Sequence, residues 1–145
     1  VSAVTTLAVD LGERRIGIAI SDSLGVAARP LTRVEHVSLA GDAARVAELA
    51  ARYSAARIVV GLPLNLDGSA GPAARRARRF ASALRKQTAA EVVCWSETLT
   101  TVEAQERVRG RGKTAQRQHQ ENVDRVAAAV ILQDYLDAQR RGGPR

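Results

Sequence analysis

The feature that most constrains the fold is a change in how successive apolar runs are connected. Three β-like runs come first, at residues 4–11, 15–21 and 27–37, and only short turns separate them. Short turns favour antiparallel neighbours, because a parallel neighbour needs a crossover of about a dozen residues or more. We therefore expect the sheet to begin as an antiparallel meander.

Helical segments separate the later strands. Residues 41–53 and 72–86 carry apolar side chains at helical spacing, and each segment precedes a compact apolar run, RIVVGL at 57–62 and EVVCWS at 91–96. Strands reached by helical crossovers are parallel to one another. The sequence thus predicts an α/β fold with a mixed five-stranded sheet, three antiparallel strands and then parallel strands, flanked by helices.

The last third of the chain is predicted to be helical. A short helix is expected at 101–109, then a basic loop containing glycines, then a long helix from about residue 119 to residue 140. We see no internal repeat and no linker, so residues 1–140 are expected to form a single domain. Residues 141–145 are expected to be a disordered tail.

The core has to be built from aliphatic side chains and alanine, because hydrophobic residues make up 46% of the chain and aromatic residues only 3%. The one cysteine, Cys94, lies on a predicted strand and is expected to be a small buried hydrophobe. No apolar run approaches the ~20 residues of a membrane span, and no secretory signal pattern opens the chain. A cytoplasmic protein without membrane contact is expected.

Three acidic residues occupy positions that such a sheet brings to one edge. Asp10 closes the first strand and Glu97 follows the fifth, and functional residues of α/β sheets gather beyond the carboxyl ends of parallel strands. Asp124 begins a largely apolar stripe of the last helix, where an acid is costly unless it is paired or binds a metal. Each acid taken alone has a simpler explanation: Asp10 could shape a turn, Glu97 could cap a helix, and Asp124 could cap its helix or form a salt bridge. The three acids taken together predict a shared site.

Clustered carboxylates repel one another unless a cation neutralises them, and hard oxygen ligands suit Mg²⁺ or Mn²⁺. Lys and Arg outnumber Asp and Glu by 22 to 15, which gives a net charge of +7. This charge fits a nucleic-acid partner, and it equally fits an Arg-rich proteome. Beside an acidic metal site, the natural substrate is a phosphodiester, with two ions about 4 Å apart activating water and stabilising the leaving oxygen.

The candidate nucleic-acid contacts are basic and polar side chains close to these acids in the predicted fold. The loop GLPLNLDGS precedes a helix start, where free N–H groups bind anions, and its Asp67 is a further acid near the site. A solvated helix face is the simpler explanation for the basic block at 75–79. The candidates are Arg14, Arg15, Asn65, Ser69, Arg75, Arg76, Arg109, Arg111 and Lys113.

Four motifs together resemble one known family. VDLGERRIGIAISD, VVGLPLNLDGS, SETLTT and NVDRVAAAVILQDYL are similar, in order and spacing, to motifs of the YqgF (RuvX) family, relatives of the RuvC Holliday junction resolvases in the ribonuclease H-like superfamily. The resemblance implies a ribonuclease H-like fold, with Asp10, Glu97 and Asp124 as catalytic metal ligands. Ser96 and Thr98 depart from the family's Asp-Glu-Arg pattern, which leaves the role of these two positions open.

The resemblance implies a metal-dependent nuclease and leaves two substrates open, branched DNA at a Holliday junction and the 5′ end of precursor 16S ribosomal RNA. A homodimer is expected if the reaction is junction resolution, because a two-fold symmetric junction needs paired cuts. One alternative is a nucleic-acid-binding module without turnover. Another is an ATP-binding domain, since DLGERRIGIA also resembles the phosphate-binding hairpin of the actin and sugar-kinase superfamily.

Overall fold

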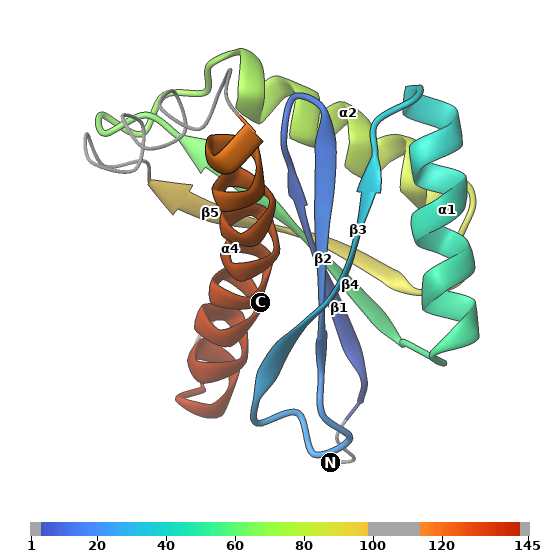
Figure 1. Ribbon diagram of the computed structural model, residues 1–145. Coiled ribbons are helices and arrows are strands. Elements are labelled where there is room, and N and C mark those ends of the chain that lie inside the picture. The colour runs from blue at the N-terminus through green and yellow to red at the C-terminus, as the bar shows by residue number, and fades with distance from the viewer. Residues whose placement is uncertain (1–3, 99–113, 143–145) are drawn as a thin grey trace.

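Strands and helices alternate along most of the chain (Figure 1). The computed structural model describes residues 4–98 and 114–142, with the side chains of residues 97, 98 and 114–126 excepted. The predicted helix at 101–109 lies outside the described residues. The elements are β1 (Thr6–Leu11), β2 (Arg15–Ser21), β3 (Ala28–Glu35), α1 (Leu39–Arg52), β4 (Arg57–Leu64), α2 (Pro72–Arg85), β5 (Glu91–Thr98) and α4 (Thr114–Arg140).

The sheet has the mixed topology that the connections predict. Its strand order is β3-β2-β1-β4-β5. The pairs β1–β2 and β2–β3 are antiparallel, whereas β1–β4 and β4–β5 are parallel. The predicted fold class is confirmed. Because β1, β3, β4 and β5 all run in the same direction, they end at one edge of the sheet, which we call the carboxyl edge.

Several element boundaries differ from the expected ones. Helix α1 begins at Leu39 rather than at residue 41, because the Ser38 hydroxyl caps it by accepting a hydrogen bond from the Gly41 N–H at 3.0 Å. Strands β4 and β5 each run two residues further than expected, since their pairing continues to Leu64 and Thr98. Helix α4 begins at Thr114, because its early Gln and Arg residues favour helix without an apolar stripe.

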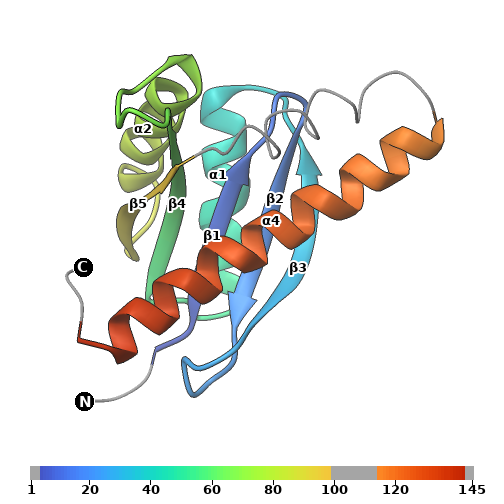
Figure 2. The ribbon, with the colours of Figure 1, turned by 90° about the vertical axis from the view of Figure 1, so that its left-hand side faces the viewer.

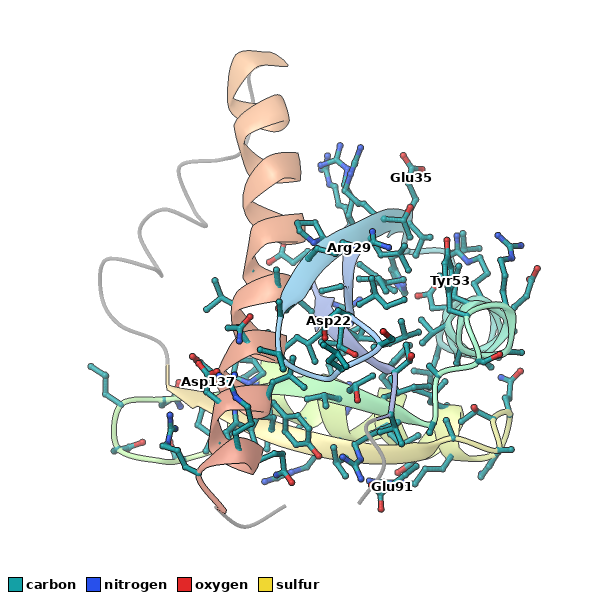
Figure 3. The ribbon with its side chains drawn as sticks, turned by 90° about the horizontal axis from the view of Figure 1, so that it is seen from below. Asp22, Arg29, Glu35, Tyr53, Glu91 and Asp137 are labelled. Atoms are coloured by element: carbon teal, nitrogen blue, oxygen red, sulfur yellow. The ribbon has the colours of Figure 1, made fainter. Side chains whose placement is uncertain are left out.

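Helices cover both faces of the sheet. Alternation along β1 directs Leu7 and Val9 into the core beneath α1 and α2, and directs Ala8 into the core beneath α4. Figure 3 shows the consequence from below, with Tyr53 at the end of α1 and Asp137 on α4 lying on opposite sides of the sheet. Helix α2 buries five side chains against the sheet, and three of them are alanines, as the composition predicts. The five residues are Ala74, Ala77, Phe80, Ala81 and Leu84.

Contacts at two places fix helix α4 across the sheet. The Gln133 side chain accepts from the Ala28 N–H at 2.9 Å and donates to the Val26 carbonyl at 2.8 Å, which ties α4 to the β2–β3 turn. The ring of Tyr135 meets Trp95 of β5 edge to face, with centroids 5.3 Å apart. Figure 2 shows α4 crossing the sheet with its N-terminal end toward the carboxyl edge.

In the described parts of the chain, no helix combines the length and apolar character needed to cross a membrane.

Candidate active site at the carboxyl edge

Asp10 lies at the carboxyl edge on the face of the sheet that α4 covers. It is the next-to-last residue of β1, half-buried, and pairs with Gly17 of β2. Asp10 belongs to the α4 face because it follows Ala8 by two residues, and Ala8 packs in the core beneath α4. The buried strand predicted from the sequence therefore does carry an acid next to its last residue, at this edge.

The backbone brings Glu97 and Asp124 to the same region. Glu97 is the next-to-last residue of β5, and alternation from Val93 and Trp95 assigns its position to the α4 face. Asp124 is four residues, or about one helical turn, before the buried Ala128 of α4. The side chains of residues 97 and 124 lie outside the described part, so the meeting of the three carboxylates stays a prediction.

The residues with described side chains contain no group of three His, Cys, Asp or Glu that could hold a metal ion. This set includes Asp10 but excludes the side chains of Glu97 and Asp124. The described side chains therefore do not test the predicted metal site.

Gly61 is a site residue that the sequence reasoning missed. It lies in β4, between β1 and β5, on the same face as Asp10, because it follows Val59 of the α4 core by two residues. A Cβ at Gly61 would lie 2.7 Å from the Ile131 Cδ1 of α4. The missing side chain thus lets α4 approach the sheet beside Asp10, and only the contact with Ile131, 70 positions away, reveals this.

Replacing Gly61 by Ala should destabilise the fold by about 1 kcal/mol, because the Ile131 Cδ1 must move aside within the packed interface between α4 and the sheet. The double variant Gly61→Ala/Ile131→Val removes the clashing Cδ1 and should recover about 1 kcal/mol relative to the sum of the single variants. Urea denaturation of the four proteins measures this coupling, and strictly additive effects would contradict the close approach.

The β1–β2 hairpin carries two of the predicted nucleic-acid contacts and is pinned by a third. The Gly12 N–H donates to the Arg15 carbonyl at 2.8 Å and closes the turn. Arg76 reaches across from α2 and donates to the Gly12 carbonyl, two residues after Asp10. Arg14 is exposed and Arg15 is half-buried. Arg76 thus supports the hairpin that bears Asp10, and the role of all three cations in binding nucleic acid stays a prediction.

The β4–α2 loop is a preformed turn at the same edge. Asn65 donates to the Ser69 hydroxyl at 2.9 Å, and the Asp67 carboxylate accepts from the Ser69 hydroxyl at 2.6 Å and from its N–H at 2.9 Å. These hydrogen bonds, the Ser69 hydroxyl first, hold the pKa of Asp67 below its ordinary value. Gly68 has a φ of +84°, which glycine adopts without strain. Asn65 and Ser69 are exposed there and stay predicted substrate contacts.

The remaining predicted contacts divide into two groups. Arg75 is exposed, and its side chain donates to the Ala70 carbonyl at 3.1 Å, at the start of α2. Arg109, Arg111 and Lys113 lie outside the described residues.

A buried acid that the sequence reasoning did not identify lies at the start of α1. Asp42 is 2% exposed and accepts from the Val37 N–H at 3.0 Å and from Arg45 at 2.6 Å. The ring of His36 donates to the same carboxylate. Burial raises the pKa of Asp42, but these hydrogen bonds outweigh burial and hold the pKa below its ordinary value. Its partners identify Asp42 as structural.

The fold is that of RuvC. A structure of Thermus thermophilus RuvC matches with a TM-score of 0.56 at 16% identity, over 95% of this chain and 96% of that one. T. thermophilus RuvC in complex with a Holliday junction substrate matches with a TM-score of 0.55, also at 16% identity, over 94% of this chain and 96% of that one.

The chain belongs to the RuvX (YqgF) family. The family model described as "RuvX: Holliday junction resolvase" matches residues 4–138. A relative from Anaeromyxobacter dehalogenans strain 2CP-1, 48% identical over 91% of this chain and 96% of its own length, is named "Putative pre-16S rRNA nuclease". A relative from Myxococcus xanthus with the same name is 42% identical over 93% of this chain and 89% of its own length. The predicted family is confirmed.

Proposed function

We propose that this chain is a metal-dependent nuclease that hydrolyses a phosphodiester at the carboxyl edge of its sheet. The observation that carries the proposal is the position of Asp10, half-buried at the end of β1, on the face that α4 covers and beside the side-chain-free Gly61. Strand alternation and helical spacing favour Glu97 and Asp124 as its companions. Membership of a family whose members carry nuclease names supports the same reaction.

The donor set fits a hard divalent cation, because carboxylate oxygens are the ligands that Mg²⁺ and Mn²⁺ prefer. When bound, such ions activate water and stabilise the charge on the leaving oxygen. Asp10, Glu97 and Asp124 would hold them. Arg14, exposed at the tip of the neighbouring hairpin, would bind a substrate phosphate. The β4–α2 loop would orient the strand, since its hydrogen bonds fix Asn65 and Ser69 before substrate arrives.

The substrate that we propose is precursor 16S ribosomal RNA. Relatives 42–48% identical over nearly the whole chain carry the name of a nuclease for this RNA. The similarity to RuvC, at 16% identity, reports on the fold alone. A Holliday junction is the second candidate, favoured by the description of the family model. It would require two active sites and hence a second copy of the chain.

The test offers the purified protein two labelled substrates, a precursor 16S RNA fragment and a four-way DNA junction, each with Mn²⁺, with Mg²⁺ and with EDTA. We expect one major cut in the RNA with either metal and no product in EDTA. Paired symmetric cuts in the junction alone would favour the second candidate. Tight binding of both substrates without scission at any metal concentration would instead identify a binding module, and the proposal would fail.

A further inference from the structure

The basic residues of α2 have two distinct kinds of surroundings. No acidic residue occurs from residue 68 to residue 90, whereas six Lys and Arg residues do. Three of the six donate to backbone carbonyls, Arg75 to Ala70, Arg76 to Gly12 and Arg85 to Val92. The other three are exposed and have no hydrogen-bond or ion-pair partner among the residues that the structure describes, and they are Arg78, Arg79 and Lys86.

These three cations line one shallow hollow on the outer side of α2. The hollow lies between α2 and the first residue of α1, and its lining contains no carboxylate; it consists of Leu39, Arg78, Arg79, Ser82, Ala83 and Lys86. The Gln87 side chain donates to the Ala40 carbonyl at 3.1 Å, which holds the end of α2 against the start of α1. Three cations are thus kept close together with no internal negative charge to neutralise them.

Helix α2 connects this hollow with the candidate active site. It starts directly after the β4–α2 loop at the carboxyl edge and runs toward α1 (Figure 1). Residues 78–86 are 6–14 positions beyond Pro72, which corresponds to about 9–21 Å along the helix. At about 3.4 Å per base pair, this distance equals about three to six base pairs of a duplex.

We infer that the outer face of α2 is a second nucleic-acid contact, at which Arg78, Arg79 and Lys86 bind the phosphate backbone of a duplex arm extending from the cleavage site. The inference rests on the proposed function, since it takes the substrate to be a structured nucleic acid. Charge complementarity selects this occupant, because a phosphate backbone supplies regularly spaced negative charges that the acid-free helix lacks. None of the three residues Arg78, Arg79 and Lys86 takes part in the proposed hydrolysis of the phosphodiester.

The test compares two double variants that remove the same charge. Arg78→Gln/Arg79→Gln changes the proposed surface, and Gln retains the helix-forming tendency of Arg. The control, Arg29→Gln/Arg52→Gln, removes two exposed cations from the start of β3 and the last residue of α1. Each protein is titrated, without divalent ion, against an RNA hairpin with a long stem of about twelve base pairs, at several salt concentrations.

With the long stem, the slope of log K against log salt should become less negative by about 1.8 in Arg78→Gln/Arg79→Gln, at about 0.9 per lost phosphate contact. A fourfold rise in salt should then cost the wild type about twelvefold more affinity than this variant. The control should match the wild type. Equal slopes for the two double variants on the long stem would overturn the inference.

The experiments distinguish failure of the proposed nuclease activity from failure of the proposed contact surface on α2. A wild-type protein that cuts neither substrate yet shows the slope difference refutes the nuclease and upholds the contact surface. A wild-type protein that cuts RNA while the two double variants bind the long stem equally refutes the surface alone. The latter result would point to an acidic protein segment as the occupant of the hollow.

Discussion

Replacement of Asp10 by Asn is expected to abolish cleavage while leaving nucleic-acid binding within about twofold of the wild type. Asn preserves the shape of the side chain but removes the negative charge that a divalent ion needs. A loss of about a thousandfold or more in the cleavage rate corresponds to about 4 kcal/mol of transition-state stabilisation. Single-turnover assays on the preferred substrate, together with filter binding, measure the two quantities.

Asp134→Asn is the matched control, because it makes the same chemical change at an exposed position of α4. Its cleavage rate should equal that of the wild type. If Asp10→Asn cuts at the wild-type rate, Asp10 is a turn-forming residue and the proposed site is wrong. If it loses binding and cleavage together, Asp10 acts in holding substrate rather than metal.

Replacing Glu97 and Asp124 by their amides tests whether these two carboxylates bind the same metal ions as Asp10. If the three carboxylates hold the same ions, Glu97→Gln and Asp124→Asn should each lower Mn²⁺ affinity in calorimetry. Double variants should be little worse in cleavage than single ones, since residues that act as a unit have non-additive effects. Independent effects that multiply would separate one of the acids from the site.

The sheet and the position of Asp10 could be predicted from the sequence because both depend on local signals. Short turns between residues 4 and 37 dictate antiparallel pairing, and helical crossovers dictate the parallel strands that follow. An acid at the end of an apolar strand then has to lie at an edge of the sheet. The edge that carries Asp10 follows from these signals, whereas the pairing of β4 with β1, and hence the strand order, is seen only in the structure.

Gly61 and Asp42 could not be predicted, because their roles depend on contacts that the sequence does not display. The need for glycine at position 61 comes from Ile131 on the opposing helix. Asp42 resembles an ordinary acid in the first turn of a helix, and only its burial against His36 and Arg45 distinguishes it. The sorting of the cations on α2 likewise depends on carbonyls, such as that of Gly12, that the fold brings near.

The buried cluster around Asp42 has a consequence for stability. The carboxylate is 2% exposed, and the side chains of His36 and Arg45 that meet it are each 36% exposed. Removing one member of a buried ion pair costs about 3–5 kcal/mol, because the remaining charges and donors lose their partner. The partial exposure of both cations favours the lower end of this range, since water compensates them in part.

Asp42→Asn is therefore expected to lower the free energy of unfolding by about 3 kcal/mol near neutral pH. The pKa of Asp42 is depressed in the folded state, so its contribution is complete above the unfolded pKa of about 4 and is lost as pH falls through the folded pKa. The difference between wild type and variant should therefore be largest above about pH 4 and shrink in acid.

Urea denaturation from pH 7 down to about pH 3 measures this difference, with Glu48→Gln as the control. Glu48 is 68% exposed and pairs with Arg52 at 3.2 Å, so its loss should cost less than about 0.5 kcal/mol. A difference between wild type and Asp42→Asn that stays constant through the acid range would show that Asp42 stabilises the start of α1 by packing rather than by its charge.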